Sequence, residues 1–356
     1  MVKTLKKVKT SRDAIEVLRQ LVGQLTDGVV VDVVSESDHE INISLCTKKN
    51  INRLRCHVVT EGQPRLIRAA ALLLQYETRL QQDQATPVIL APYLSQQSQA
   101  ICREHQVGFI DCQANAWLAS EHYLIISQVV GRPVVQRRDL RSLFKPKSAQ
   151  VLKVMLRDPF KNWRMAPLAE VAGVSLGLVS KVRQGLLDRE WAQVSAKGMS
   201  LCAHESLLDD WSKNYQSPAG KQSSYYTTLH GTALAEQLKA VMQQTPKDAS
   251  ICLASFSAAQ WISPFVRNSN QYLYVDVCGL DFLIEKLRLS ESPHGGIFVT
   301  VVEDPILFRD TFTPHLGIRC TSAVQTYLDL SIAGERAEEA AAYLRRNVLN
   351  AKKNIE

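Results

Sequence analysis

The chain has 356 residues, of which 46% are hydrophobic and 22% are charged, a composition typical of a folded protein with two or three domains. No apolar stretch reaches the ~18–20 residues that a membrane-spanning helix needs, and no apolar segment of a signal peptide follows the basic N-terminus. We therefore expect a cytoplasmic protein without a membrane partner.

The positive charge of the chain is concentrated in one segment. The net charge is +7, yet the segment from Arg132 to Arg164 holds ten Lys and Arg against Asp139 and Asp158, which is 10 − 2 = +8. These cations are Arg132, Arg137, Arg138, Arg141, Lys145, Lys147, Lys153, Arg157, Lys161 and Arg164. Because phosphate contacts supply much of the affinity of DNA-binding proteins, the segment favours a nucleic-acid partner.

The eight cysteines stand singly in the sequence. A zinc site requires paired ligand spacing, so we expect no metal ligands. Gly-rich phosphate loops, which would indicate nucleotide binding, are also missing from the chain. The segment Ser255–Ser257 lacks both glycines of the GxSxG sequence that would indicate serine hydrolysis. The sequence predicts no catalytic residue, no cofactor and no enzyme.

The first part of the chain, residues 1–140, alternates helical and strand patterns and predicts an α/β domain. Helices are expected at 13–25 and 66–80 and from residue 95, and strands at 29–34, 41–45, 54–59, 87–92 and 107–111. The last of these strands is expected to continue through 116–119, past Asn115. The order of elements resembles the restriction-endonuclease-like core.

A nuclease of that class holds Mg²⁺ with an acid from one strand and an acid-x-lysine pair from the next. The matching positions are Asp32 and Glu61, but Gln63 stands where the lysine belongs. An amide cannot supply the cation that organises the attacking water. We expect a degenerate nuclease fold that serves as a scaffold or contact surface; a metal-dependent nuclease is the alternative.

Residues 141–212 predict a winged helix-turn-helix. A helical pattern at 149–156 ends before Pro159, and the next helix offers the small Ala169 where a second helix crosses it. Gly173 supplies the positive φ of the turn, and Ser175 stands where the second helix requires an N-cap.

The second helix and the segment after it complete this pattern. Val179 and Val182 share one helical face and close the core. Two strands at 191–194 and 199–202 flank a turn at 196–198 that predicts the wing. The alternative is a helical hairpin buried in an unrelated helical domain.

The second helix carries the residues expected to contact bases. Helical spacing points six of them outward: Ser175, Leu176, Gly177, Ser180, Lys181 and Gln184. Ser180, Lys181 and Gln184 can hydrogen-bond base edges, and Leu176 can contact a thymine methyl group. The cations expected at phosphates are Arg183, Lys145, Lys147, Arg164 and Lys197 in the wing. The predicted partner is double-stranded DNA.

Residues 213–356 predict a second α/β domain, which follows a linker at 214–226. Strands are expected at 251–254, 272–277 and 297–302, and helices at 233–242, 258–266, 282–289, 323–330 and 336–349. The whole chain is therefore an α/β multidomain protein with a central DNA-binding module.

Three stretches resemble a known family. They are Gly108–Ala116, Leu143–Ala149 running into Gly173–Arg183, and Gln325–Leu330 with Gly334–Ala341. Together they are similar, over roughly residues 54–350, to the AbiEi-like antitoxins and transcriptional regulators of bacterial type IV toxin-antitoxin (abortive infection) systems. In that family the winged helix usually comes first, whereas here an α/β domain precedes it.

The resemblance implies a repressor that binds its own promoter through the winged helix. It also implies that the C-terminal domain opposes a nucleotidyltransferase-like toxin encoded nearby, without forming a tight complex. We expect an autorepressor in a toxin-antitoxin or phage-defence locus. A toxin-neutralising interaction protein is the alternative, and the sequence leaves a homodimer open.

Overall fold

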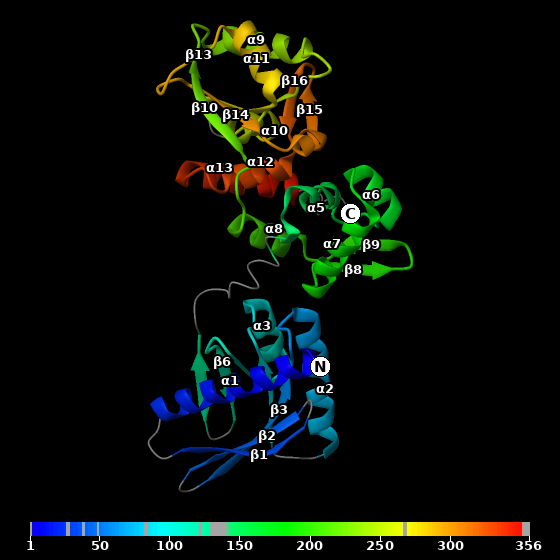
Figure 1. Ribbon diagram of the computed structural model, residues 1–356, viewed down its shortest axis with the longest axis vertical. Coiled ribbons are helices and arrows are strands. Elements are labelled where there is room, and N and C mark those ends of the chain that lie inside the picture. The colour runs from blue at the N-terminus through cyan, green and yellow to red at the C-terminus, as the bar shows by residue number, and fades with distance from the viewer. Residues whose placement is uncertain are drawn as a thin grey trace. The chain divides into compact units, whose positions relative to one another are not determined.

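The computed structural model describes residues 2–25, 29–37, 40–47, 50–81, 85–120, 123–128, 140, 142–265 and 269–350 (Figure 1). The chain forms two compact units. The first comprises Met1–Asp139 with Gly185–Glu190, and the second comprises Leu140–Gln184 with Trp191–Glu356.

The first unit is built on a seven-stranded sheet whose strands lie side by side in chain order. The strands are β1 (Val30–Glu36), β2 (Glu40–Cys46), β3 (Ile51–Val58), β4 (Thr86–Ala91), β5 (Gly108–Asp111), β6 (Ala116–Ala119) and β7 (Leu124–Ser127). β3, β4 and β5 run parallel, because α2 (Pro64–Gln81) and α3 (Gln96–Glu104) form the crossover connections between them. The other neighbouring strands are antiparallel.

Helices cover both faces of this sheet. Successive side chains of a strand point to opposite faces, so Val88 and Leu90 of β4 join the core beneath α1 (Val2–Leu25). Ile89 and Ala91 join the core beneath α2 and α3. The predicted α/β layering is therefore present in this unit.

The prediction that strand 107–111 continues through 116–119 is wrong. β6 turns back and pairs antiparallel with β5, with Trp117 opposite Phe109. The buried carboxylate of Asp111 fixes the reversal, since its Oδ1 accepts the N–H groups of Gln113 and Asn115 at 2.8 and 2.9 Å. β7 completes this edge of the sheet and was not predicted.

The second unit begins with a small helical module. It contains α5 (Pro146–Arg157), α6 (Met165–Ala172), α7 (Leu176–Asp188) as far as Gln184, an antiparallel hairpin of β8 (Ala192–Ser195) and β9 (Gly198–Leu201), and α8 (His204–Lys213). The ring of Phe144 stacks on Trp211 and Trp191, with centroids 5.3 and 6.5 Å away. Both indoles are buried, so these three rings join the hairpin and α8 to the start of α5.

A second seven-stranded sheet follows, in the order β13-β10-β14-β12-β11-β16-β15. Its strands are β10 (Gly220–Tyr226), β11 (Ile251–Leu253), β12 (Gln271–Val275), β13 (Ser290–Glu291), β14 (Ile297–Val302), β15 (Thr311–His315) and β16 (Ile318–Thr321). Its helices are α9 (Gly231–Gln243), α10 (Ser255–Ile262), α11 (Val277–Leu287), the 3-10 helix η1 (Pro305–Asp310), α12 (Ala323–Leu330), α13 (Glu335–Leu344) and the π-helix η2 (Arg345–Leu349). We call this the C-terminal α/β part.

The predicted linker at 214–226 is largely a strand. β10 pairs antiparallel with β14 over residues 220–225. Gly220, which suggested a loop, lies where a Cβ would come within 2.2 Å of the carbonyl oxygen of Val301. The glycine therefore permits close strand approach.

No single helix of the described residues is long and apolar enough to cross a membrane. α6 and α7 meet that criterion only when they are taken together, and the two helices are bent by 109° at the break between them.

Candidate nucleic-acid interface and its buried support

The turn between α6 and α7 depends on one glycine. Gly173 ends α6 at φ 63° and ψ 39°, a left-handed conformation that costs other residues about 1–2 kcal/mol. Its N–H and that of Val174 bond back to carbonyl groups of the last turn of α6. The positive φ predicted for Gly173 is confirmed.

The start of α7 is capped as the sequence predicts. Ser175 precedes the helix, and its hydroxyl accepts the N–H of Leu178 at 3.3 Å. Val179 and Val182 are fully buried, and they fix α7 against the module. The opposite face of α7 is left open to solvent.

That open face, together with Ser175 just before it, holds the residues expected at bases. Their side chains, or the backbone in the case of glycine, are exposed at Ser175, Leu176, Gly177, Ser180, Lys181 and Gln184. A Cβ placed on Gly177 would meet no atom within 4 Å. The structure therefore brings these residues together on one surface, and their role at bases stays a prediction.

The cations expected at phosphates come from several elements of the module. Lys145 and Lys147 stand at the start of α5, Arg164 directly precedes α6, and Lys197 lies in the turn of the hairpin; all four are exposed. Arg183 of α7 is half-buried. The remaining cations of the basic segment, Arg132, Arg137, Arg138 and Arg141, lie outside the described residues.

The hairpin that carries Lys197 is anchored by Trp163. The backbone N–H of Trp163 donates to Met199 at 2.7 Å, and Met199 donates back at 2.9 Å. Gly198 takes φ 134°, and a Cβ there would lie 2.6 Å from the carbonyl oxygen of Trp163. The Lys161 ammonium lies 4.1 Å from the centre of the Trp163 ring. The tip of the hairpin is thus held close to the segment before α6.

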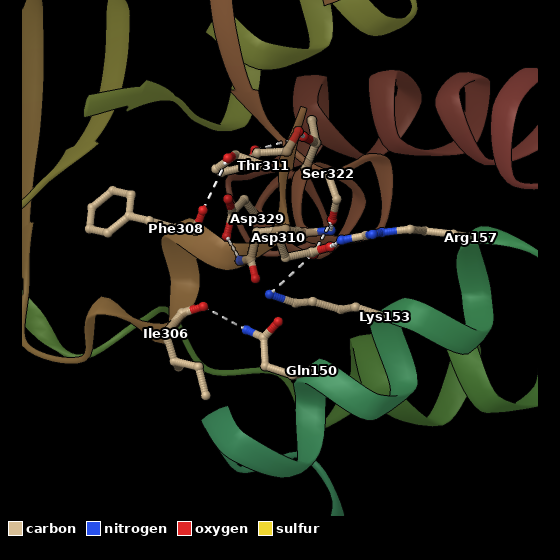
Figure 2. A network of polar contacts seen from close by, with 12 residues as sticks. Gln150, Lys153, Arg157, Ile306, Phe308, Asp310, Thr311, Ser322 and Asp329 are labelled. Atoms are coloured by element: carbon tan, nitrogen blue, oxygen red, sulfur yellow. Dashed lines mark hydrogen bonds and ion pairs between the residues drawn. The ribbon is translucent and has the colours of Figure 1, made fainter. Parts of the chain in front are cut away.

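A buried ionic cluster lies between α5 and η1 (Figure 2). Asp310 at the end of η1 is almost completely buried, and its carboxylate faces Lys153 and Arg157, one turn apart on α5. The Lys153 ammonium lies 3.6 Å from Oδ2, and the Arg157 Nε donates to Oδ1 at 3.1 Å. Ser322 donates its hydroxyl to Oδ2 at 2.5 Å.

Two further contacts extend this cluster. The Gln150 side chain of α5 donates to the carbonyl oxygen of Ile306 at 3.0 Å. Ser322 also caps α12, since its hydroxyl accepts the N–H of Gln325 at 3.2 Å. Because η1 and α12 belong to the C-terminal α/β part, the cluster joins that part to α5.

A second buried carboxylate lies on α12. Asp329 Oδ1 accepts the hydroxyl of Tyr215 at 2.5 Å and the amide of Gln325 at 2.8 Å. Burial raises the pKa of Asp329 to about 6, although these hydrogen bonds and the charge of Lys153 act in the opposite direction. Burial also lowers the pKa of Lys153, against the attraction of Asp310 and Asp329.

Sequence reasoning assigned Lys153 and Arg157 to the basic segment that favours DNA, and for Lys153 this is wrong. Its side chain is only 5% exposed, and both cations face Asp310. A lysine inside the otherwise apolar run Val151–Leu156 is the signal that could have indicated a buried ion pair. Asp310, Ser322 and Asp329 were not predicted.

The structure separates the two acids of the nuclease alternative. Asp32 of β1 is opposite Ser44 of β2, which is opposite Arg53 near the start of β3. β3 ends at Val58, five residues or roughly 17 Å beyond Arg53 along the strand, and Glu61 follows after that end. Asp32 and Glu61 therefore do not form one metal site. Within the described ranges no group of three or more His, Cys, Asp or Glu could hold a metal ion.

Comparison with known proteins gives a match in the C-terminal part of the chain. Residues 200–350 match the family model described as "Transcriptional regulator, AbiEi antitoxin, Type IV TA system". This confirms the resemblance over that range, which covers α8 and the C-terminal α/β part. No curated protein and no solved structure shows significant similarity to the chain.

Proposed function

We propose that the chain is a sequence-specific DNA-binding transcriptional regulator that represses its own promoter in a toxin-antitoxin or phage-defence locus. Residues 141–212 act as a winged helix-turn-helix in this proposal, and the protein works in the cytoplasm, where its DNA lies. The family description of residues 200–350 supports a regulator of a type IV system.

The exposed face of α7 is the observation that carries the proposal. Leu176, Ser180 and Gln184 follow one another at a spacing of four and share a face with Gly177 and Lys181. The sequence has no acidic residue from Val171 to Leu187. A capped helix with small and polar side chains and no negative charge suits the major groove, which admits one α-helix.

The proposed roles follow the chemistry of each side chain. Ser180, Lys181 and Gln184 contact base edges, and Leu176 contacts a thymine methyl group. Arg183, Lys145, Lys147, Arg164 and Lys197 contact phosphates, which fix the register of the protein on DNA but carry no sequence information. A two-fold symmetric operator would require two copies of the chain.

A gel-shift assay on the DNA upstream of its own gene tests this function. The wild-type chain is expected to retain a specific complex at ~150–200 mM salt over competitor DNA. Lys181→Glu should abolish that complex without unfolding the protein. Lys247→Glu makes the same charge change at an exposed site of the C-terminal α/β part and should bind like wild type. Unchanged operator affinity of Lys181→Glu contradicts the assignment.

The match of residues 200–350 to an antitoxin family favours a second function, neutralisation of a toxin. Co-expression of full-length Lys181→Glu with a neighbouring nucleotidyltransferase-like toxin separates the two functions. Protection by this variant supports neutralisation that is independent of operator binding. Loss of protection together with operator binding supports repression alone.

A further inference from the structure

Arg309 of η1 reaches the turn between α6 and α7 from a position 136 residues away in the sequence. One of its terminal nitrogens donates toward the carbonyl oxygen of Gly173 at 3.4 Å. The glycine makes room for this contact, because a Cβ at residue 173 would lie 1.9 Å from the same nitrogen. A side chain of the C-terminal α/β part thus lies at the entry to α7.

The position of Arg309 is fixed by its neighbour. Asp310 follows directly and is held by Lys153, Arg157 and Ser322 in the buried cluster. Because two of these partners belong to α5, η1 is attached to the same module that carries α7. The approach of Arg309 to Gly173 is therefore anchored by a buried residue on its own short helix.

The guanidinium of Arg309 retains donors for a ligand. Its side chain is exposed, and no carboxylate in the described part of the chain forms an ion pair with it. A guanidinium has five N–H donors, and the long contact to Gly173 uses one of them. The planar donor pair suits a phosphate group, which arginine binds in a bidentate manner.

We propose that Arg309 is a phosphate-binding residue, and that the C-terminal α/β part thereby contributes directly to the DNA interface. This inference rests on the proposed function. The N-terminal end of the second helix of a helix-turn-helix contacts base edges, so a cation at the turn just before that end lies beside the sugar-phosphate backbone. The DNA-binding surface then comprises residues of the helical module and Arg309 of the C-terminal α/β part.

The test compares full-length Arg309→Ala with Arg309→Lys and with Arg319→Ala. Arg319 is another exposed arginine of the same part, on β16, with its backbone N–H near Met242 of α9. Arg309→Ala should lower affinity roughly tenfold for the operator and for unrelated DNA alike, and reduce the slope of log K against log salt by about 0.9. Arg309→Lys should keep the slope, and Arg319→Ala should match wild type.

Phosphate-ethylation interference on the operator provides a second measurement. One phosphate whose ethylation weakens wild-type binding should become neutral for Arg309→Ala. An unchanged slope and an unchanged interference pattern would overturn the role of Arg309 while the wild-type operator complex persists. A lower melting temperature with an unchanged slope would also overturn it and would leave Arg309 as support of the turn. Failure of the wild-type chain to form any DNA complex would overturn the proposed function and this inference together.

Discussion

The ammonium of Lys153 lies 3.6 Å from the carboxylate of Asp310, and both side chains are almost fully buried. Such a pair gains little stability over apolar residues of the same volume, but removal of one member leaves an uncompensated buried charge. The pair therefore joins α5 to η1 at a cost if either member is removed.

Asp310→Asn is expected to lower the free energy of unfolding by about 3–5 kcal/mol, because Lys153 would lose its nearest counter-charge in the interior. Urea unfolding of the full chain, followed by tryptophan fluorescence, measures this loss. Asp281→Asn changes an exposed carboxylate of α11 and should stay within about 0.5 kcal/mol of wild type. Equal urea midpoints of unfolding for Asp310→Asn and Asp281→Asn would show that the Lys153–Asp310 pair does not stabilise the contact between α5 and η1.

Lys153→Met should cost less than Asp310→Asn. Arg157 and Ser322 still hold the carboxylate of Asp310 in this variant, and the apolar side chain avoids the desolvation of an ammonium. The same urea titration compares the two variants. A larger loss for Lys153→Met would indicate that Lys153, rather than Arg157, supplies the main counter-charge.

The raised pKa of Asp329 makes stability fall as pH rises. The folded chain binds this proton with a pKa of about 6, whereas the ordinary value is 3.8. The folded state therefore holds more protons between these values, and the penalty is complete above pH 6. The unfolding free energy of wild type minus that of Asp329→Asn should drop by about 2–3 kcal/mol from pH 4 to pH 7.

Urea titrations at several pH values measure that difference. Tyr215, Tyr274 and Lys153 surround Asp329, and all three are present in both proteins, so their own titrations cancel to first order. A difference that stays constant, or that rises with pH, would contradict a protonated Asp329 in the folded state.

Gly173→Ala should destabilise the chain in two ways. The left-handed φ costs about 1–2 kcal/mol, and the new Cβ displaces Arg309. A double-mutant cycle with Arg309→Ala separates these contributions, since the second one vanishes when the arginine is already absent. Strictly additive losses would mean that Arg309 moves aside freely.

Gly177→Ala should separate stability from DNA binding. The added Cβ meets no atom within 4 Å, and alanine stabilises a helix interior by about 0.5–1 kcal/mol relative to glycine. Close approach of α7 to the floor of the groove would make the same methyl group lower operator affinity. A higher melting temperature together with unchanged operator affinity would place Gly177 away from the DNA.

Local features of the second unit were predictable because their causes lie within a few residues. Gly173 forms the turn through its left-handed backbone conformation. Ser175 caps α7 by accepting a hydrogen bond from Leu178, three residues further along the chain. Val179 and Val182 are buried as helical periodicity predicts. The exposed face of α7 follows directly from the same periodicity, so the candidate base-contacting residues were found from the sequence.

Long-range contacts were not predictable in this way. The serines and glycine of β10 are typical of a linker, and the strand forms only because β14 supplies its hydrogen-bonding partner. Likewise, β6 turns back because Asp111 binds the N–H groups that follow it. Strand pairing is decided by the neighbouring strand, and composition alone does not reveal that neighbour.

The residues alone predict the turn between α6 and α7, the hairpin of β8 and β9 and the resemblance to an antitoxin family, which the comparison confirms over residues 200–350. Tertiary structure decided which cations remain available to a ligand. Arg157 finds Asp310 at a distance of 153 residues along the chain, and Lys153 joins them in the interior, whereas Arg309 stays exposed beside Gly173. All three side chains carry the same charge, and the sequence does not distinguish them. Folding sets the burial and the partners of each cation, and these determine the strength of its interactions and whether a ligand can reach it.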